Sequence, residues 1–143
     1  MAISDETSKK FREFVKLQGW DNKFIDRERE KRILEEGVMR FEISLNEGRA
    51  MMLGVAAENG FAVERDAEDR MRIILERFAG TDREIEKREF DDAVAIFQRF
   101  SNGHIRESDA RVRLKKIMED NGWRPKKLGM FRSRKWYRQI AES

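Results

Sequence analysis

The stretch from Thr81 to Phe90, TDREIEKREF, joins the two most regular helical patterns in the chain. On either side of it, apolar residues recur three and four positions apart, which places them along one face of a helix. These residues are Ala67, Met71, Ile74, Leu75 and Phe78 upstream, and Phe90, Ala93, Val94, Phe97 and Phe100 downstream. Gly80 favours a helix end between them, because glycine readily adopts the left-handed conformation that ends helices. The stretch therefore predicts a helix, a short turn, a buried Ile85 and a second helix.

Versions of this pattern recur about every 20 residues, each with an apolar residue four positions before an acidic one. We refer to these apolar residues as the anchors: Phe24, Ile43, Ala62, Ile85 and Ile105. Their spacing suits one helix of three to four turns followed by a short turn. Ser44 and Glu47 also form a capping box, which marks a helix start. We interpret the pattern as an irregular internal repeat of helical units, although an ordinary bundle with capped turns would look similar. The expected fold is an all-α single-domain bundle of six or seven helices.

Composition limits the class of protein. The 143 residues suit a single domain, and a charged fraction of 41% favours helices with solvated faces. The absence of cysteine excludes disulfides and thiolate metal sites. The start, MAISDETSKK, has no apolar core of a signal peptide, and no apolar run is long enough to span a membrane. These features predict a cytoplasmic protein.

The net charge of +3 is unevenly distributed. Residues 1–123 contain 24 Lys and Arg against 27 Asp and Glu, whereas residues 124–143 contain seven basic residues and one acid. We expect a helical domain over residues 1–123 and a basic, aromatic segment over residues 124–143 that forms a short helix, packed on the domain or extending from it. An apolar pattern from Leu128 to Ala141 places that helix.

The sequence gives no indication of catalysis. Its one histidine, His104, lies in a predicted turn beside Asn102 and Gly103, with no partner at useful spacing. Phosphate-binding glycine loops, nucleophile elbows and zinc-binding helix motifs are all absent. We therefore expect a protein that is not an enzyme and that needs no cofactor, with calcium as the one ion to consider.

A local resemblance to a calcium-binding loop is the reason to consider calcium. A standard EF-hand loop has oxygen ligands at positions 1, 3, 5 and 12, and the turns beginning at Asp21 and Asp82 do not supply them. However, residues 79–90, AGTDREIEKREF, resemble the shortened first loop of penta-EF-hand proteins. This resemblance implies a metal site with Asp82 and Glu89 as side-chain ligands, and with the carbonyl groups of Ala79 and Glu84.

Over more of the chain, the sequence resembles the tellurite-resistance TerB and DjlA-like helical domain. That family repeats an ADG-x-I-x-x-x-E turn between helices, and residues 82–89 and 59–66 are similar to it, with residues 102–109 a looser copy. Arg83 stands where the family usually has glycine. The resemblance implies an all-α domain that acts as a scaffold or sensing module.

The C-terminal segment is the predicted partner-binding surface because it interleaves basic and aromatic side chains. The predicted residues are Arg124, Lys126, Lys127, Phe131, Arg132, Arg134, Lys135, Trp136, Tyr137 and Arg138. Basic groups neutralise phosphates, and aromatic rings stack on bases or bind at interfaces. In the alternative interpretation, the rings pack on the core and only the charges face water. The function predicted from these features is a non-enzymatic protein-interaction or regulatory module. Nucleic-acid or anionic-lipid binding through residues 124–138, and metal sensing, remain as alternatives.

Overall fold

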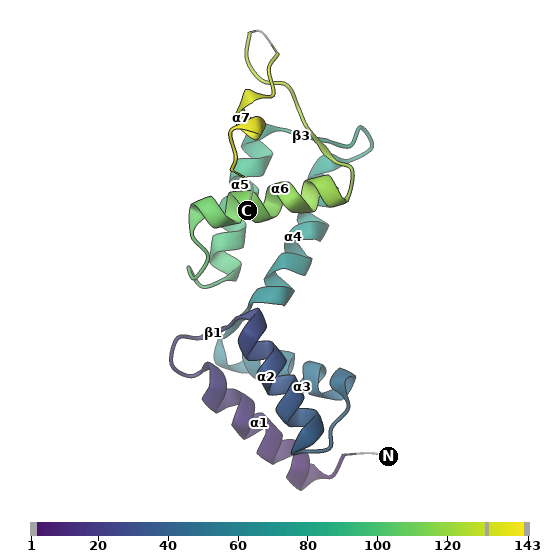
Figure 1. Cartoon of the computed structure of the whole chain (residues 1–143), viewed down its shortest axis with the longest axis vertical. Helices are drawn as coiled ribbons and strands as arrows, with labels where there is room; N and C mark the ends of the chain where they lie inside the picture. The colour runs from purple at the N-terminus through teal and green to yellow at the C-terminus, as the bar shows by residue number, and fades with distance from the viewer. Residues whose placement is uncertain (1–2, 131, 142–143) are drawn as a thin grey trace. The chain divides into compact units, whose positions relative to one another are not determined.

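The computed structural model describes residues 3–130 and 132–141, which form an all-α fold, as the sequence predicts (Figure 1). Over these ranges there are seven helices and four strands of two residues each. No helix in the described part of the chain combines the length and the apolar character needed to cross a bilayer. Contacts between residues divide the chain into two compact units, residues 1–66 and 67–143.

The first unit consists of three long helices and two short strands. Its elements are α1 (Asp5–Gly19), β1 (Phe24–Ile25), α2 (Arg27–Met39), α3 (Leu45–Asn59) and β2 (Ala62–Val63). Side-chain caps fix where these helices start, because Oγ of Ser4 accepts from the amide of Thr7 and Oδ1 of Asp26 accepts from the amide of Arg29. Ser44 and Glu47 form the predicted cap of α3, with the Ser44 hydroxyl donating to Oε1 of Glu47 at 2.7 Å.

The second unit repeats this order. Helix α4 (Glu64–Ala79) begins at the end of the first unit and continues into the second. It is followed by β3 (Glu84–Ile85), α5 (Lys87–Phe100), α6 (Glu107–Asp120), β4 (Arg124–Pro125) and the short α7 (Lys135–Arg138). Helix α5 starts as predicted, with a capping box between Glu86 and Glu89.

The five anchors are all buried, which confirms the pattern that defined them. Ile85 is fully inaccessible to solvent, and the exposed fractions of the others do not exceed 9%. Of the anchors, Ile43 belongs to the apolar core of the first unit, and Ile85 and Ile105 belong to that of the second. Burying one such isoleucine side chain contributes roughly 1.5 to 3 kcal/mol. These three anchors therefore hold their turns against the core of their own unit.

The turns of the two units match in detail. Ile25 and Ile85 are 60 residues apart and end equivalent turns. In each turn, one residue has a φ of +60°, Lys23 in the first and Arg83 in the second. The amides of these two residues donate to the carbonyl groups of Gly19 and Ala79, at 2.9 and 3.0 Å respectively. A positive φ is uncommon for residues other than glycine, so its presence at both Lys23 and Arg83 marks the two turns as copies of one conformation.

A second type of turn follows α3 and α6, and again the two copies agree. Gly60 and Gly122 both have a φ of +70°, the left-handed conformation that ends a helix. The next residues, Phe61 and Trp123, fold back so that each amide donates to a carbonyl of the preceding helix at 2.9 Å. The chain is thus a tandem repeat of a unit of about 60 residues, larger than the 20-residue units that the sequence pattern showed.

Short parallel strands join the two turns within each unit, although the predicted bundle lacked any β-structure. β1 pairs with β2, and β3 pairs with β4. The amide of Ala62 donates to the carbonyl of Lys23, and the amide of Arg124 donates to that of Arg83, both at 2.9 Å. Two-residue strands carry too few side chains for the alternation that identifies a strand in a sequence.

The predicted helix from Leu128 to Ala141 is wrong in extent. Only Lys135–Arg138 are helical, and Leu128 instead pairs with Ser133 in an isolated antiparallel bridge. Gly129 and Arg132 adopt φ values of +89° and +50°, which are incompatible with a continuous helix. Residues 124–141 pack within the second unit, where Tyr137 belongs to the apolar core.

Candidate functional site

The backbone at the start of the C-terminal segment is fixed in place, because the preceding Trp123 is part of the core and the next residues pair with β3. Trp123 is buried, and its amide donates to the carbonyl of Met118. Arg124 and Pro125 then form β4, in which Pro125 is buried and the Arg124 side chain is exposed. The amide of Lys126 completes the pairing by donating to the carbonyl of Ile85 at 2.8 Å. Arg124 therefore faces solvent from a well-ordered position.

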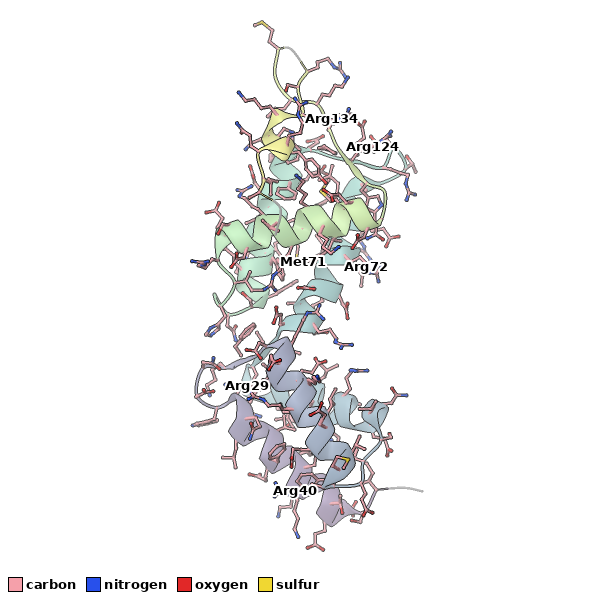
Figure 2. All side chains as sticks on the ribbon, viewed as in Figure 1. Arg29, Arg40, Met71, Arg72, Arg124 and Arg134 are labelled. Carbon is pink, nitrogen blue, oxygen red and sulfur yellow. The ribbon has the colours of Figure 1, made fainter. Side chains whose placement is uncertain are left out.

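Arg134 is a basic residue that holds the segment in place. Its Nε donates to the carbonyl of Pro125 at 2.7 Å, and a terminal nitrogen donates to Oε2 of Glu84 at 3.2 Å. Arg124 and Arg134 lie at the same end of the second unit (Figure 2). Because its guanidinium is already paired, Arg134 fastens α7 to the β3–β4 pair and is not part of the exposed charge.

Two aromatic residues of the segment, Trp136 and Tyr137, face inward. Trp136 packs on Phe90, with ring centroids 5.5 Å apart, and its Nε1 donates to the carbonyl of Lys126. Tyr137 is buried, and its hydroxyl donates to the carbonyl of Lys115. Burial, reinforced by nearby Glu119, raises the pKa of the Tyr137 phenol far above its usual value, so the hydroxyl stays protonated. These rings occupy the positions that the alternative sequence interpretation assigned to them.

Lys115 also helps to hold the segment, from the opposite side. It is buried on α6, and its Nζ donates to the carbonyl of Ile140 at 3.2 Å and lies 5.0 Å from the centre of the Tyr137 ring. A buried ammonium group needs such partners because its desolvation is costly. This role cannot be predicted from the sequence, since Lys115 looks like any other charged residue of an amphipathic helix.

Between β4 and α7 the chain forms a small closed loop. The amide of Leu128 donates to the carbonyl of Ser133 at 2.7 Å, and the amide of Ser133 donates back to Leu128 at 2.9 Å. We call residues 128–133 the tip loop; it projects past α7 in Figure 1. Met130 in this loop is 92% exposed and Leu128 is 49% exposed. Phe131, a predicted partner-binding residue, lies outside the described residues.

The remaining predicted cations face solvent. Lys126 lies 3.8 Å from Glu86, which is a weak ion pair between exposed groups. The others are exposed and form no ion pair with any described residue: Arg124, Lys127, Arg132, Lys135 and Arg138. The structure thus separates the predicted set into inward-facing supports and outward-facing charges. Sequence analysis missed the exposed apolar residues Met130 and Leu128.

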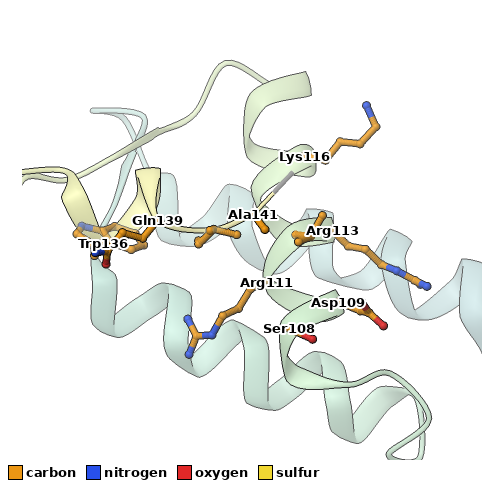
Figure 3. A pocket seen from close by; sticks show the side chains of 10 residues that line it. Ser108, Asp109, Arg111, Arg113, Lys116, Trp136, Gln139 and Ala141 are labelled. Atoms are coloured by element: carbon orange, nitrogen blue, oxygen red, sulfur yellow. The ribbon is translucent and has the colours of Figure 1, made fainter. Parts of the chain in front are cut away.

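A groove of about 860 Å³ lies beside α7, between α6 and the end of the chain (Figure 3). Trp136 and Ile140 line one side, and Arg111, Arg113 and Lys116 come from α6. The charges of this groove are largely neutralised within the unit, since Arg111 pairs with Asp91 and Glu107, and Lys116 with Asp120. The groove is therefore a weaker candidate for an anion site than the exposed segment.

The predicted metal ligands Asp82 and Glu89 both accept hydrogen bonds from nearby amides. Oδ1 of Asp82 accepts from the amide of Glu84 at 3.1 Å, and Oε1 of Glu89 accepts from the amide of Glu86 at 2.9 Å. The described residues contain no group of three or more His, Cys, Asp or Glu side chains able to hold a metal ion. Calcium binding at Asp82 and Glu89 stays a prediction. A rise in melting temperature on adding calcium, absent from Asp82→Ala, would support it.

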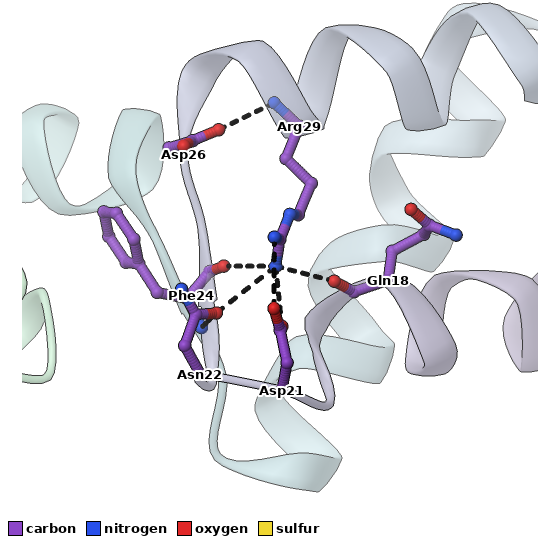
Figure 4. A network of polar contacts seen from close by, with 6 residues as sticks. All are labelled: Gln18, Asp21, Asn22, Phe24, Asp26 and Arg29. Atoms are coloured by element: carbon purple, nitrogen blue, oxygen red, sulfur yellow. Dashed lines mark hydrogen bonds and ion pairs between the residues drawn. The ribbon is translucent and has the colours of Figure 1, made fainter.

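In the first unit, the turn equivalent to the one at Asp82 is held together by hydrogen bonds from the side chain of Arg29. A terminal nitrogen of Arg29 lies within 3.3 Å of four oxygen atoms, two from carbonyl groups and two from side chains (Figure 4). The accepting oxygens belong to Gln18, Asp21, Asn22 and Phe24. The hydrogen bond from Arg29 is the main reason that the pKa of Asp21 is lowered. In the second unit, Glu89 stands at the position of Arg29.

His104, the one titratable imidazole in the chain, is exposed in the turn between α5 and α6. The described partner-binding residues that the sequence predicted belong to a different part of the second unit, the stretch from β4 to α7. The exposed charges of residues 124–138 therefore form the candidate functional site. Comparison of the chain with family models, with curated proteins and with solved structures found no match.

Proposed function

We propose that the chain is a non-enzymatic interaction module and that the exposed cations of residues 124–138 bind an anionic surface on its partner. The observation that carries this proposal is that some side chains of residues 124–138 face inward and hold the backbone, whereas the others are exposed charges. Arg134, Trp136 and Tyr137 turn inward and hold the backbone, while five cations point outward with no acidic side chain to neutralise them in the described structure.

Charge supports the proposal. The second unit contains 19 Lys and Arg against 14 Asp and Glu, and the first contains 12 against 14. The excess of the second unit comes from residues 124–138, because residues 67–123 contain 12 basic and 13 acidic residues. Unneutralised cations that are close in sequence raise the local positive potential, which attracts anionic partners and speeds their association.

The fixed backbone of the C-terminal segment also supports the proposal that it binds an anionic surface. A flexible basic tail loses conformational entropy when it binds, whereas a segment already fixed by its own contacts loses little. Here the backbone on either side of the tip loop is fixed by β4 and by α7. The outward cations are therefore presented from a preorganised surface.

A protein with an acidic patch would supply such a surface, which agrees with the scaffold or sensing role that the resemblance to TerB-like domains implies. Nucleic acids and anionic membranes offer the same charge. Base stacking is disfavoured, however, because Trp123 and Tyr137 are buried and Trp136 packs on Phe90.

Binding to heparin, a soluble sulfated polymer, tests the charge requirement. We expect salt-dependent binding by the full chain, and a roughly tenfold or greater loss when Lys127, Lys135 and Arg138 are all replaced by Glu, because like charges across an interface are strongly unfavourable. The matched control replaces the exposed Lys9, Lys31 and Arg32 of the first unit by Glu. An equal loss in the control would contradict the assignment of the surface to residues 124–138.

A further inference from the structure

We propose that the partner of this surface is an anionic lipid bilayer, with Met130 inserted between the lipids and the flanking cations placed at the headgroups. This inference rests on the proposed function, because four outward cations, Lys127, Arg132, Lys135 and Arg138, contribute to both. It adds a role for the tip loop, which charge alone does not explain.

The first support is the apolar end of the tip loop. Met130 is 92% exposed and Leu128 is 49% exposed, although the other described large apolar residues of the segment are buried or half-buried. Single exposed apolar residues are common and need no explanation on their own. Met130, however, lies between Leu128 and Ser133, which pair to close the loop, so its side chain can enter an apolar phase without moving any helix.

The second support is the position of the cations around that apolar end. Lys126 and Lys127 precede Leu128, Arg132 lies within the tip loop, and Lys135 and Arg138 follow it. All five side chains are exposed. Long basic side chains can lay their methylene groups along an apolar surface while the charge stays at the polar boundary. An apolar tip bordered by Lys and Arg is the arrangement that binds the interface of an anionic membrane.

The third support is the stiffness of the loop. Two backbone hydrogen bonds between Leu128 and Ser133 close it, and the amide of Arg132 donates to the carbonyl of Gly129 at 3.0 Å. The chain before the loop is joined to the chain after it, because the side chains of Arg134 and Trp136 donate hydrogen bonds to the carbonyl groups of Pro125 and Lys126. A loop closed in this way keeps Met130 outward before binding, so insertion requires little ordering of the chain.

A lipid surface fits these features better than a nucleic acid does. A duplex offers phosphates to the cations but no apolar phase to Met130, and single strands are bound largely by stacking on aromatic rings. The aromatic rings in the described part of the segment are occupied by packing within the unit. Of these two kinds of partner, the bilayer is the one that uses both the charge and the apolar tip.

The experiment is co-sedimentation of the full chain with vesicles of phosphatidylcholine, with and without phosphatidylserine. We expect binding only when phosphatidylserine is present. Met130→Ser should weaken that binding roughly tenfold, as expected for the loss of one inserted apolar side chain. Met39→Ser is the matched control, because Met39 is 81% exposed at the end of α2 in the first unit. Circular dichroism checks that both variants keep their helices.

The outcomes separate this inference from the proposed function. Equal vesicle binding by Met130→Ser and the unaltered chain would overturn insertion. If the chain binds heparin, duplex DNA or poly-glutamate through its cations but ignores vesicles, the proposed function stands and the membrane inference fails. If replacing Lys127 and Lys135 by Glu changes binding to none of these probes, both fail.

Discussion

Gly19 lies against the ring of Phe61 so closely that a Cβ on Gly19 would be 2.5 Å from Cδ2 of Phe61. Gly19 ends α1, and Phe61 follows the left-handed Gly60 after α3, so this contact joins the two turns of the first unit. The Phe61 ring is buried and belongs to the core, which leaves it little room to withdraw.

Replacing Gly19 with alanine should therefore destabilise the protein by about 1 to 3 kcal/mol, the usual cost of overpacking a core. Urea unfolding followed by circular dichroism measures the change. Gly54→Ala is the control, because the nearest atom to its added Cβ is a terminal nitrogen of Arg12 at 3.7 Å. Alanine within a helix is favoured over glycine by up to about 1 kcal/mol, so the control should stabilise. Destabilisation of both variants by the same amount would contradict the role of Phe61.

Arg134→Gln should destabilise the second unit by about 1 to 3 kcal/mol, because it removes two charge-assisted hydrogen bonds and leaves Glu84 without its partner. The matched control is Arg138→Gln, one turn further on, where the side chain is exposed and unpaired among the described residues. Thermal unfolding should show a lower midpoint for the first variant and almost no change for the second. Equal midpoints would mean that Arg134 does not fasten the segment.

Arg29→Met should cost about 1 to 3 kcal/mol, because it leaves the oxygen atoms around the first turn without their shared donor. The pKa of Asp21 should also rise toward its ordinary value, since the hydrogen bond from Arg29 is the main cause of its depression. NMR titration of the carboxyl group measures this directly. Arg32→Met, on the exposed face of the same helix, should change neither quantity.

Asp91 should make stability depend on pH. Burial favours its neutral form, but hydrogen bonds from Lys87 at 2.8 Å and Arg111 at 3.0 Å outweigh that effect, so its pKa in the folded protein is lowered. A lowered folded pKa contributes stability above the unfolded value of about 3.9, and this contribution is lost as the pH falls through the folded pKa.

Unfolding by urea between neutral pH and about pH 3 should therefore show a shallower loss of stability for Asp91→Asn than for the unaltered chain. Asp92→Asn, at the exposed neighbouring position, is the control. Identical pH profiles for Asp91→Asn and the unaltered chain would show that the contacts with Lys87 and Arg111 are too weak to matter.

The sequence predicted the helices well, because long amphipathic patterns and capping residues act locally. Ser44 caps α3 as the Ser44–Glu47 pattern predicted, and the anchors at 24, 43, 62, 85 and 105 are buried. The short parallel strands could not be predicted, since each depends on pairing between turns about 40 residues apart.

The candidate site at residues 124–138 stays a prediction from charge, and the structure adds its arrangement. Charge counting could not show that Arg134 would turn inward or that Met130 would be exposed. The apolar spacing from Leu128 onward was interpreted as a helix, where the structure has a loop closed by Leu128 and Ser133. The 60-residue repetition was also missed, because the anchors Phe24 and Ile85 are not equivalent: Ile85 corresponds to Ile25.

The closure of the tip loop by main-chain atoms has an evolutionary consequence. Apart from Gly129, whose φ of +89° few other residues adopt, its closure does not depend on the identity of its side chains. Substitutions at Met130 can therefore retune affinity or switch targets while the helices beneath stay unaltered. The same freedom makes this loop a natural place to graft a foreign recognition peptide onto the scaffold.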